Sequence, residues 1–327
     1  MSKAQANANF YSLTGDSHES KNTKEYIEYR KSWEEFPEKF FLRDFPMHLD
    51  VEVTNLCNLR CTFCDKQPLL KNKKDFGYME MNLFKSIIDE GAENRLWGLK
   101  LSYRGESLLH PQIVEMVDYS KKKGILDVYF NTNGMLLNES ISKGFVEKGL
   151  DRISVSVEGI DPVVFAQSRI GANFETIKRN VANLIEIREK KNSIFPRVRM
   201  QTVLFPGTDL EEYKEYWKDY CDEVAAVDYK DESKKEHIIA EDWACPQLWQ
   251  RMTIGWDGKI FMCNNDDNST TDLGYYQNNN IKKIWLGEEM KIIRDAHKRG
   301  KSHQVASCDG CPWRTAQIKK DSSFWRN

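Results

Sequence analysis

The chain has 327 residues, of which 40% are hydrophobic and 12% aromatic, so it is long enough for one large domain or two smaller ones. Its formal net charge of −2 excludes a strong overall attraction to nucleic acid or to an anionic membrane. It has no run of about 18 apolar residues and no signal-peptide h-region, so we expect a cytoplasmic protein without a membrane or nucleic-acid partner. In that compartment its eight cysteines are better explained as metal ligands than as disulfides.

The first 47 residues form an extension that precedes the first predicted strand. Residues 1–24 are rich in Ser, Asn and Ala, a composition typical of disorder. Residues 23–36 then predict a charged helix with Tyr26, Tyr29 and Trp33 near one side. We expect this helix to pack on the outside of the domain that follows or to cover part of its rim.

Residues 48–234 alternate between strand-like and helix-like segments. The predicted strands are 49–53, 99–103, 127–131, 152–157, 198–203 and 223–228. The helices between them are predicted at 81–90, 111–123, 139–148, 174–190 and 210–220. Repeated βα units form parallel sheets with right-handed crossovers, and six strands are too few for a full eightfold barrel. The predicted fold class is therefore α/β, a partial (β/α)6 barrel whose chemistry gathers at the C-terminal strand ends.

Three cysteines lie on the loop that leaves the first predicted strand. Cys57, Cys61 and Cys64 occur in the sequence C-N-L-R-C-T-F-C. Three thiolates can hold three irons of a [4Fe–4S] cluster and leave the fourth iron open, whereas four cysteines normally close such a cluster. The alternatives are buried free thiols or a zinc site, but zinc needs a fourth Cys or His, and none follows within the next 45 residues.

The C-x-x-x-C-x-x-C pattern resembles that of radical S-adenosylmethionine (SAM) enzymes. The resemblance implies that the open iron chelates the amino and carboxylate groups of SAM, so that the three cysteines are the catalytic residues. It implies that the reduced cluster cleaves SAM to a 5′-deoxyadenosyl radical. It also implies an electron donor of the flavodoxin or ferredoxin type. The lysine run 71–74 after the loop is interpreted as a solvated face, with flavodoxin or phosphate docking as the alternative.

The same resemblance implies a SAM pocket at the ends of the following strands. Gly105-Glu106 is similar to the family's Gly-Glu motif, in which glycine permits close approach and the carboxylate accepts from the SAM ammonium. The remaining residues assigned to SAM, for its ribose, methionyl group, carboxylate and adenine, are Asn133, Ser156, Arg169 and Phe63. Turn capping is the alternative role for the polar ones.

Residues 235–327 carry a second set of cysteines, Cys245, Cys263, Cys308 and Cys311. The pair Asp257-Gly258 between apolar runs predicts a β-hairpin. The order of these cysteines resembles the twitch domain of radical SAM enzymes, a hairpin plus helix that is a shorter relative of the SPASM domain. The resemblance implies one auxiliary [4Fe–4S] cluster that four cysteines close. A structural zinc site is the alternative.

The eighth cysteine, Cys221, follows the fifth predicted helix and leads into a strand from its N-terminal end. We interpret it as a packing residue. The alternative is a hydrogen-atom donor to a substrate radical.

The whole pattern from about residue 48 to 315 resembles the aminocyclitol and sugar alcohol dehydrogenases of the radical SAM family. This implies an oxidoreductase that oxidises a carbinol carbon of a small carbohydrate-like substrate to a ketone. Candidates for the base are Tyr103, Arg104, Glu158 and Arg251. A redox-neutral sugar epimerase and a ribosomal-peptide-modifying enzyme are alternatives. The 47 residues before the first strand disfavour the peptide enzyme, which commonly carries a larger leader-binding domain there.

Overall fold

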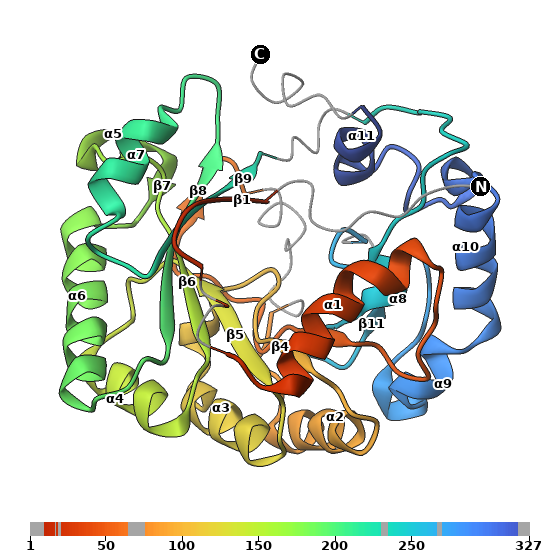
Figure 1. The fold of residues 1–327 in the computed structure, drawn as a ribbon, viewed down its shortest axis with the longest axis horizontal. Coiled ribbons are helices and arrows are strands. Elements are labelled where there is room, and N and C mark those ends of the chain that lie inside the picture. Colours follow the sequence, from red (N-terminus) through yellow and green to blue (C-terminus); the bar gives the residue numbers. More distant parts are fainter. Residues whose placement is uncertain are drawn as a thin grey trace.

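Six parallel strands form the barrel part of the curved, nine-stranded sheet that dominates the described structure (Figure 1). This computed structural model describes residues 10–16, 18, 21–64, 76–229, 235–266 and 270–319. In spatial order the parallel strands are β9 (Glu223–Asp228), β8 (Arg197–Leu204), β6 (Arg152–Ser156), β5 (Asp127–Thr132), β4 (Gly98–Lys100) and β2 (His48–Val51). The predicted α/β partial barrel is confirmed, because each neighbouring pair in this order is parallel.

The helices pack on the outer face of this sheet (Figure 1). They are α2 (Met81–Glu93), α3 (Ile113–Lys122), α4 (Glu139–Lys148), α5 (Pro162–Ser168), α6 (Phe174–Lys190) and α7 (Leu210–Trp217). Apolar and polar residues alternate along β2, so they lie on opposite faces of the sheet. Leu49 and Val51 join Phe84 of α2 in the apolar core, whereas Asp50, on the other face, pairs with Arg251. The inner face of the barrel is therefore polar.

A strand in the N-terminal extension corrects the expectation of disorder there. Residues Phe10–Thr14 form β1, which pairs antiparallel with β9 at the edge of the sheet. Tyr11 donates a hydrogen bond to Asp228 at 3.3 Å. Composition alone did not predict this strand, because its partner lies more than 200 residues away.

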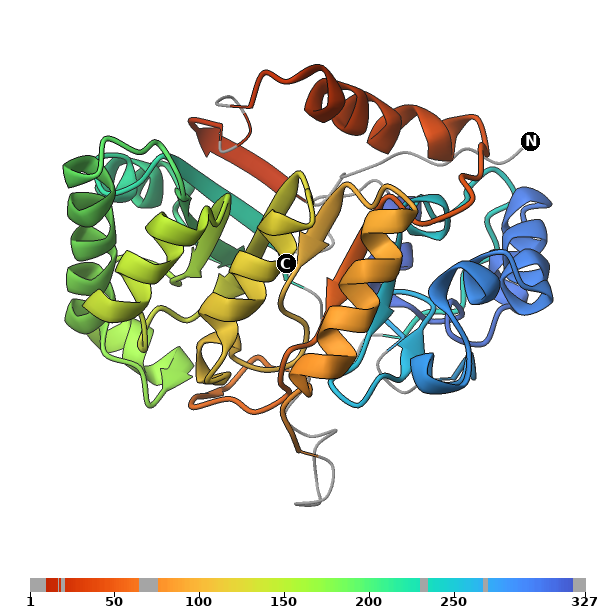
Figure 2. The ribbon, with the colours of Figure 1, turned by 90° about the horizontal axis from the view of Figure 1, so that it is seen from below.

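Helix α1 (Lys24–Glu38) lies at the end of the barrel opposite the cysteine loop (Figure 2). Tyr29 lies 3.3 Å from His48, the first residue of β2, and Trp33 packs against the same imidazole. A small apolar cluster of Tyr26, Tyr29, Trp33 and Met47 closes this end. The helix therefore covers the N-terminal strand ends and not the catalytic rim.

The C-terminal residues extend the barrel sheet directly. Strand β10 (Arg251–Ile254) pairs parallel with β2, and β11 (Ile260–Phe261) pairs antiparallel with β10. The turn between them contains Gly258 at φ +86°, as the Asp-Gly pair predicts. The C-terminal part also contains four helices, α8 (Gln247–Gln250) before this hairpin and α9 (Ile281–Trp285), α10 (Glu288–Lys298) and α11 (Pro312–Lys319) after it. Within the described ranges, no helix has the length and apolar character needed to cross a membrane.

Candidate active site

The loop after β2 brings Cys57, Cys61 and Cys64 to the C-terminal rim of the barrel. Its geometry is fixed by a short strand pair, in which β3 (Arg60–Cys61) runs antiparallel to β7 (Arg169–Ile170). The Cys64 amide donates to the carbonyl of Cys61 at 3.2 Å, which closes a tight turn. The three thiols therefore lie on one compact loop, as the spacing predicts.

Burial raises the pKa of the Cys57 thiol and raises that of Cys61 to about 11. Charge on Cys64 would raise both further, so the three thiols are close enough to influence one another. Iron binds the thiolate, and a bound metal displaces these protons. The donor set fits a cluster that three cysteines hold.

Arg169 is buried beside this loop and connects it to the end of β6. Its guanidinium makes a two-pronged ion pair with Glu158, in which Nη2 lies 2.8 Å from Oε1. Its Nη1 lies 3.8 Å from the Cys61 sulfur, and its charge lies 5.3 Å from the centre of the Phe63 ring. Burial would lower the pKa of Arg169, but Glu158 outweighs that effect and raises it. The structure thus brings Arg169 together with Cys61 and Phe63, as predicted for this rim.

Glu106 is buried and accepts three hydrogen bonds from this chain. Its donors are the Thr132 hydroxyl at 2.7 Å and the amides of Asn133 and Leu108 at 2.7 and 3.0 Å. Burial raises the pKa of Glu106, and these bonds act against it. The carboxylate ties the ends of β4 and β5 together, and its contact with SAM stays a prediction.

Gly105 lies where no side chain fits. A Cβ there would lie 2.4 Å from the carbonyl oxygen of Thr54 and 2.5 Å from that of Leu56. The motif predicts that Gly105 allows the backbone to come close to SAM. In this structure, Gly105 allows its backbone to pack closely against residues 54–56, which lead into the cysteine loop.

Asn133 and Ser156 follow β5 and end β6. The Asn133 side chain donates to Asn58 at 2.8 Å and accepts from the Met135 amide at 3.0 Å. It therefore caps a turn and also reaches the cysteine loop. Ser156 is half-buried at the rim. The contact of both residues with SAM stays a prediction.

Charged pairs occupy the inner face of the barrel. Arg104 binds Glu52 through two contacts of 2.7 Å, and the same carboxylate accepts from the Trp256 amide at 3.3 Å. Deeper down, Arg251 reaches Asp50 at 3.3 Å. Sequence reasoning did not single out Asp50 and Glu52, although their alternation with apolar residues in the first strand was the available signal.

Of the four candidate bases, three are held in ion pairs. Arg104 pairs with Glu52, Glu158 with Arg169, and Arg251 with Asp50. Tyr103 stacks edge-on against Phe261 of β11, with ring centres 5.7 Å apart.

The second set of cysteines meets in one cavity. Cys245, Cys263, Cys308 and Cys311 all line it, together with Trp243, Met262 and Trp313. Burial raises the pKa of the Cys245 thiol to about 12, and burial followed by the neighbouring thiols raises those of Cys263 and Cys308. Four thiols around one apolar cavity fit a closed iron–sulfur cluster. Two further polar residues of this cavity, His297 and Arg314, carried no sequence signal.

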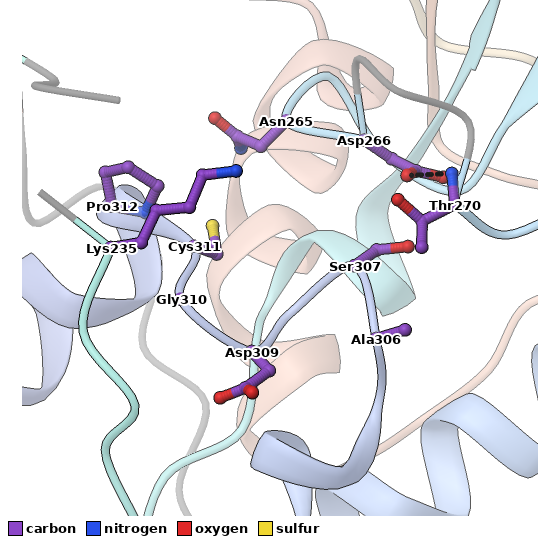
Figure 3. Close-up of a pocket in the computed structure, with 10 residues that line it drawn as sticks. All are labelled: Lys235, Asn265, Asp266, Thr270, Ala306, Ser307, Asp309, Gly310, Cys311 and Pro312. Atoms are coloured by element: carbon purple, nitrogen blue, oxygen red, sulfur yellow. Dashed lines mark hydrogen bonds between the residues drawn. The ribbon is translucent and has the colours of Figure 1, made fainter. Parts of the chain in front are cut away.

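Cys311 also faces outward. It lines a neighbouring polar pocket with Lys235, Asn265, Asp266 and Ser307. Figure 3 shows the Cys311 sulfur and the Lys235 amino group both pointing toward the side on which Asn265 lies. Cys311 therefore lies between the cysteine cavity and this polar pocket.

In the described part of the chain, no three His, Cys, Asp or Glu side chains converge closely enough to hold a single metal ion. The ligands of a four-iron cluster stand farther apart than those of one ion, so this arrangement is compatible with the cluster. The lysine run 71–74 lies outside the described residues.

Cys221 lies at the opposite end of the barrel, between α7 and β9. Its thiol contacts the carbonyls of Trp217 and Glu223 at 3.3 and 3.1 Å. Burial raises its pKa to about 12. These contacts agree with a packing role.

Comparison with known sequences decides the family. The sequence profile of the radical SAM superfamily matches residues 51–219, just over half of the chain. The chain belongs to the radical SAM superfamily. A second profile, that of the SPASM iron–sulfur cluster-binding domain, matches residues 245–312. A radical SAM chain with this domain uses SAM, a SAM-binding [4Fe–4S] cluster and an auxiliary [4Fe–4S] cluster. The predicted divisions at residues 47 and 234 stay predictions.

Curated relatives of this radical SAM chain differ in their named activities. A probable GTP 3',8-cyclase of Methanococcus maripaludis is 31% identical over 137 residues, which are 42% of this chain and 45% of the relative. A tungsten-containing aldehyde ferredoxin oxidoreductase cofactor-modifying protein of Pyrococcus furiosus is 30% identical over 164 residues, or 48% of this chain and 43% of the relative. The chain thus spans less than half the length of these relatives.

Solved structures show the same fold at low identity. BtrN in complex with AdoMet and 2-DOIA matches with a TM-score of 0.57 and 18% identity, covering 83% of this chain and 94% of BtrN. Streptococcus suis SuiB bound to precursor peptide SuiA matches with a TM-score of 0.65 and 13% identity, covering 89% and 76%. The fold is thus shared with proteins whose bound ligands differ widely, AdoMet and 2-DOIA in BtrN and a precursor peptide in SuiB.

Proposed function

We propose that this radical SAM enzyme is an oxidoreductase that converts a carbinol of a sugar or aminocyclitol to a ketone. The supporting observation is the second cysteine set, since four thiols line one cavity. A cluster closed by four cysteines has no open iron for substrate, so electron transfer is the role left to it. Oxidation needs such an electron acceptor, whereas a redox-neutral epimerisation does not.

The ligands follow from the two cysteine sets. Cys57, Cys61 and Cys64 hold the SAM-binding cluster, and Cys245, Cys263, Cys308 and Cys311 hold the auxiliary one. When bound, SAM and its reduced cluster supply a hydrogen-atom abstractor, and the auxiliary cluster supplies a one-electron acceptor. We assign the orientation of SAM to Arg169 and Phe63, and the supporting observation is that Arg169 lies beside both Cys61 and Phe63.

The polar inner face of the barrel supports a hydroxyl-rich substrate. Arg104 and Glu52 form a fixed donor and acceptor pair near the rim, where a polyol would exchange its water for protein hydrogen bonds. Tyr103, just beyond the C-terminal end of β4, is the candidate for taking the hydroxyl proton, because Arg104 is a protonated guanidinium paired with Glu52 and has no acceptor site. Arg251 is held against Asp50 near the floor.

A nucleotide cyclase is the second candidate, because curated relatives at about 30% identity are named GTP 3',8-cyclase. Epimerisation with Cys221 as hydrogen donor is disfavoured, because that thiol lies at the N-terminal end of β9, away from the cysteine loop. Peptide modification stays an alternative that the fold alone does not address.

The deciding experiment supplies the reduced enzyme with SAM and a panel of aminocyclitols and sugars deuterated at single carbinol carbons. We expect one SAM to be consumed per ketone formed, with the substrate deuterium appearing in 5′-deoxyadenosine. Parallel reactions contain GTP. Solvent deuterium in an unoxidised product, or turnover of GTP alone, would contradict the proposal.

A further inference from the structure

His297 of α10 lies fully buried against the auxiliary cysteine cavity and has a defined tautomer. Its Nδ1 accepts a hydrogen bond from the Cys245 amide at 3.1 Å. A ring nitrogen that accepts carries no proton, so the proton of the neutral ring is on Nε2. Nε2 lies 3.4 Å from the Cys308 sulfur. His297 therefore donates an N–H to one cysteine of the cavity.

Arg314 of α11 lines the same cavity with only 1% of its surface exposed. Its Nε donates to the Ser302 hydroxyl at 2.9 Å, and its Nη2 donates to the Ile238 carbonyl at 2.7 Å. Its Nη1 is buried and has no hydrogen-bond partner among the described residues. A buried donor of a charged group costs free energy unless something accepts from it. The cavity of the four thiols is where that acceptor would lie.

We propose that His297 and Arg314 are positioning residues for the auxiliary cluster, binding its sulfur atoms and raising its reduction potential. Reduction adds negative charge to a cluster that is already anionic through its four thiolates. An N–H donor and a buried positive charge stabilise that added charge, and hydrogen bonds to sulfur are an established determinant of cluster potential. The proposal rests on the auxiliary cluster and not on which substrate is oxidised.

The test isolates the auxiliary cluster in the full chain by Cys57→Ala, Cys61→Ala and Cys64→Ala. In that background, Arg314→Met should lower the equilibrium constant for one-electron reduction at least tenfold, which is 59 mV in a redox titration followed by EPR. The matched control is Arg294→Met on α10. Arg294 is also buried, binds the carbonyls of Leu248 and Trp285, and does not line the cavity. Its removal should leave the potential unchanged.

Two substitutions at His297 separate hydrogen bonding from packing. His297→Phe keeps a ring but removes the N–H and should lower the potential. His297→Gln offers an amide donor and acceptor and should restore most of it. Four irons per chain, measured in each variant, verify that a cluster is present.

A measurement without any substitution at these two sites keeps the proposal testable if the variants fail to fold. Pulsed EPR of the reduced auxiliary cluster, with ¹⁵N-labelled histidine or arginine, should show nitrogen couplings from both residue types. Absence of both couplings would overturn the proposal. Equal potentials in Arg314→Met, Arg294→Met and His297→Phe, with four irons each, would also overturn it.

Discussion

Arg169 and Cys61 face each other across the β3–β7 strand pair, with Nη1 of the guanidinium 3.8 Å from the thiol sulfur. The same guanidinium forms an ion pair with Glu158, which fixes its position. A single buried side chain therefore links the cysteine loop to the end of β6. Any group that binds at this loop meets a fixed positive charge.

The first prediction concerns SAM affinity. Arg169→Lys keeps the charge but loses the two-pronged geometry, so we expect SAM to bind about 10- to 150-fold more weakly, the value of one charged hydrogen bond. Equilibrium dialysis of the reconstituted protein measures this. Arg188→Lys is the control, because Arg188 is a buried arginine paired with Asp222 at the other end of the barrel. Equal affinities in both variants would show that Arg169 does not contact SAM.

The second prediction concerns metal content. Anaerobically reconstituted protein should hold about eight irons per chain in two four-iron clusters. Changing Cys57, Cys61 and Cys64 to alanine should halve that number and abolish SAM cleavage. Iron and zinc are measured by elemental analysis of the same sample. Four irons with one tightly held zinc would assign the C-terminal cysteines to zinc instead.

The third prediction separates the two radical outcomes. Cys308→Ala with Cys311→Ala removes the auxiliary cluster and should stop ketone formation, while SAM cleavage continues more slowly. Cys221→Ser should leave the rate of ketone formation near that of the wild type, because its thiol lies at the N-terminal end of β9, away from the rim. A sharp loss with Cys221→Ser would favour epimerisation with that thiol as donor.

The fourth prediction concerns the joint between β2 and β10. Asp50→Asn leaves Arg251 without its buried counter-charge and should cost about 3–5 kcal/mol in the free energy of unfolding. Adding Arg251→Met should recover much of that loss. Urea unfolding of the anaerobic protein measures both. Additive losses would show that the two groups do not interact.

The pH dependence of the same pair has a definite sign. Burial alone would raise the pKa of Asp50, but Arg251 and His48 outweigh it and hold the pKa below its usual range. The pair therefore contributes its full stability above the unfolded pKa of about 3.9 and loses it as the pH falls toward the folded value. The difference between wild type and Asp50→Asn should shrink below about pH 4.

Much of the barrel was predictable because its signals are local. The helices over 139–148 and 174–190 and the strand over 223–228 match the structure residue for residue. The gathering of Cys57, Cys61 and Cys64 followed from their spacing after the first strand, whereas that of the second cysteine set followed from the resemblance to the twitch domain. The partners of β1 and β10 were not predictable, because each pairs with a strand about 200 residues away. His297 and Arg314 were missed for the same reason, since only tertiary packing brings them to the cysteines.

The pairing of β10 with β2 determines how the two cysteine sets are spaced. One set follows β2 directly, and the hairpin that begins with β10 leads to Cys263 of the other. Strand register, and not the length of the segment between residues 229 and 247, therefore fixes how far Cys263 lies from the loop of the first cysteine set. A change in the register of β10 against β2 would alter this separation only in steps of about 3.3 Å per residue. A shift by one residue would also move each side chain of β10 to the other face of the sheet. Insertions in the connecting segment should therefore leave this separation unchanged.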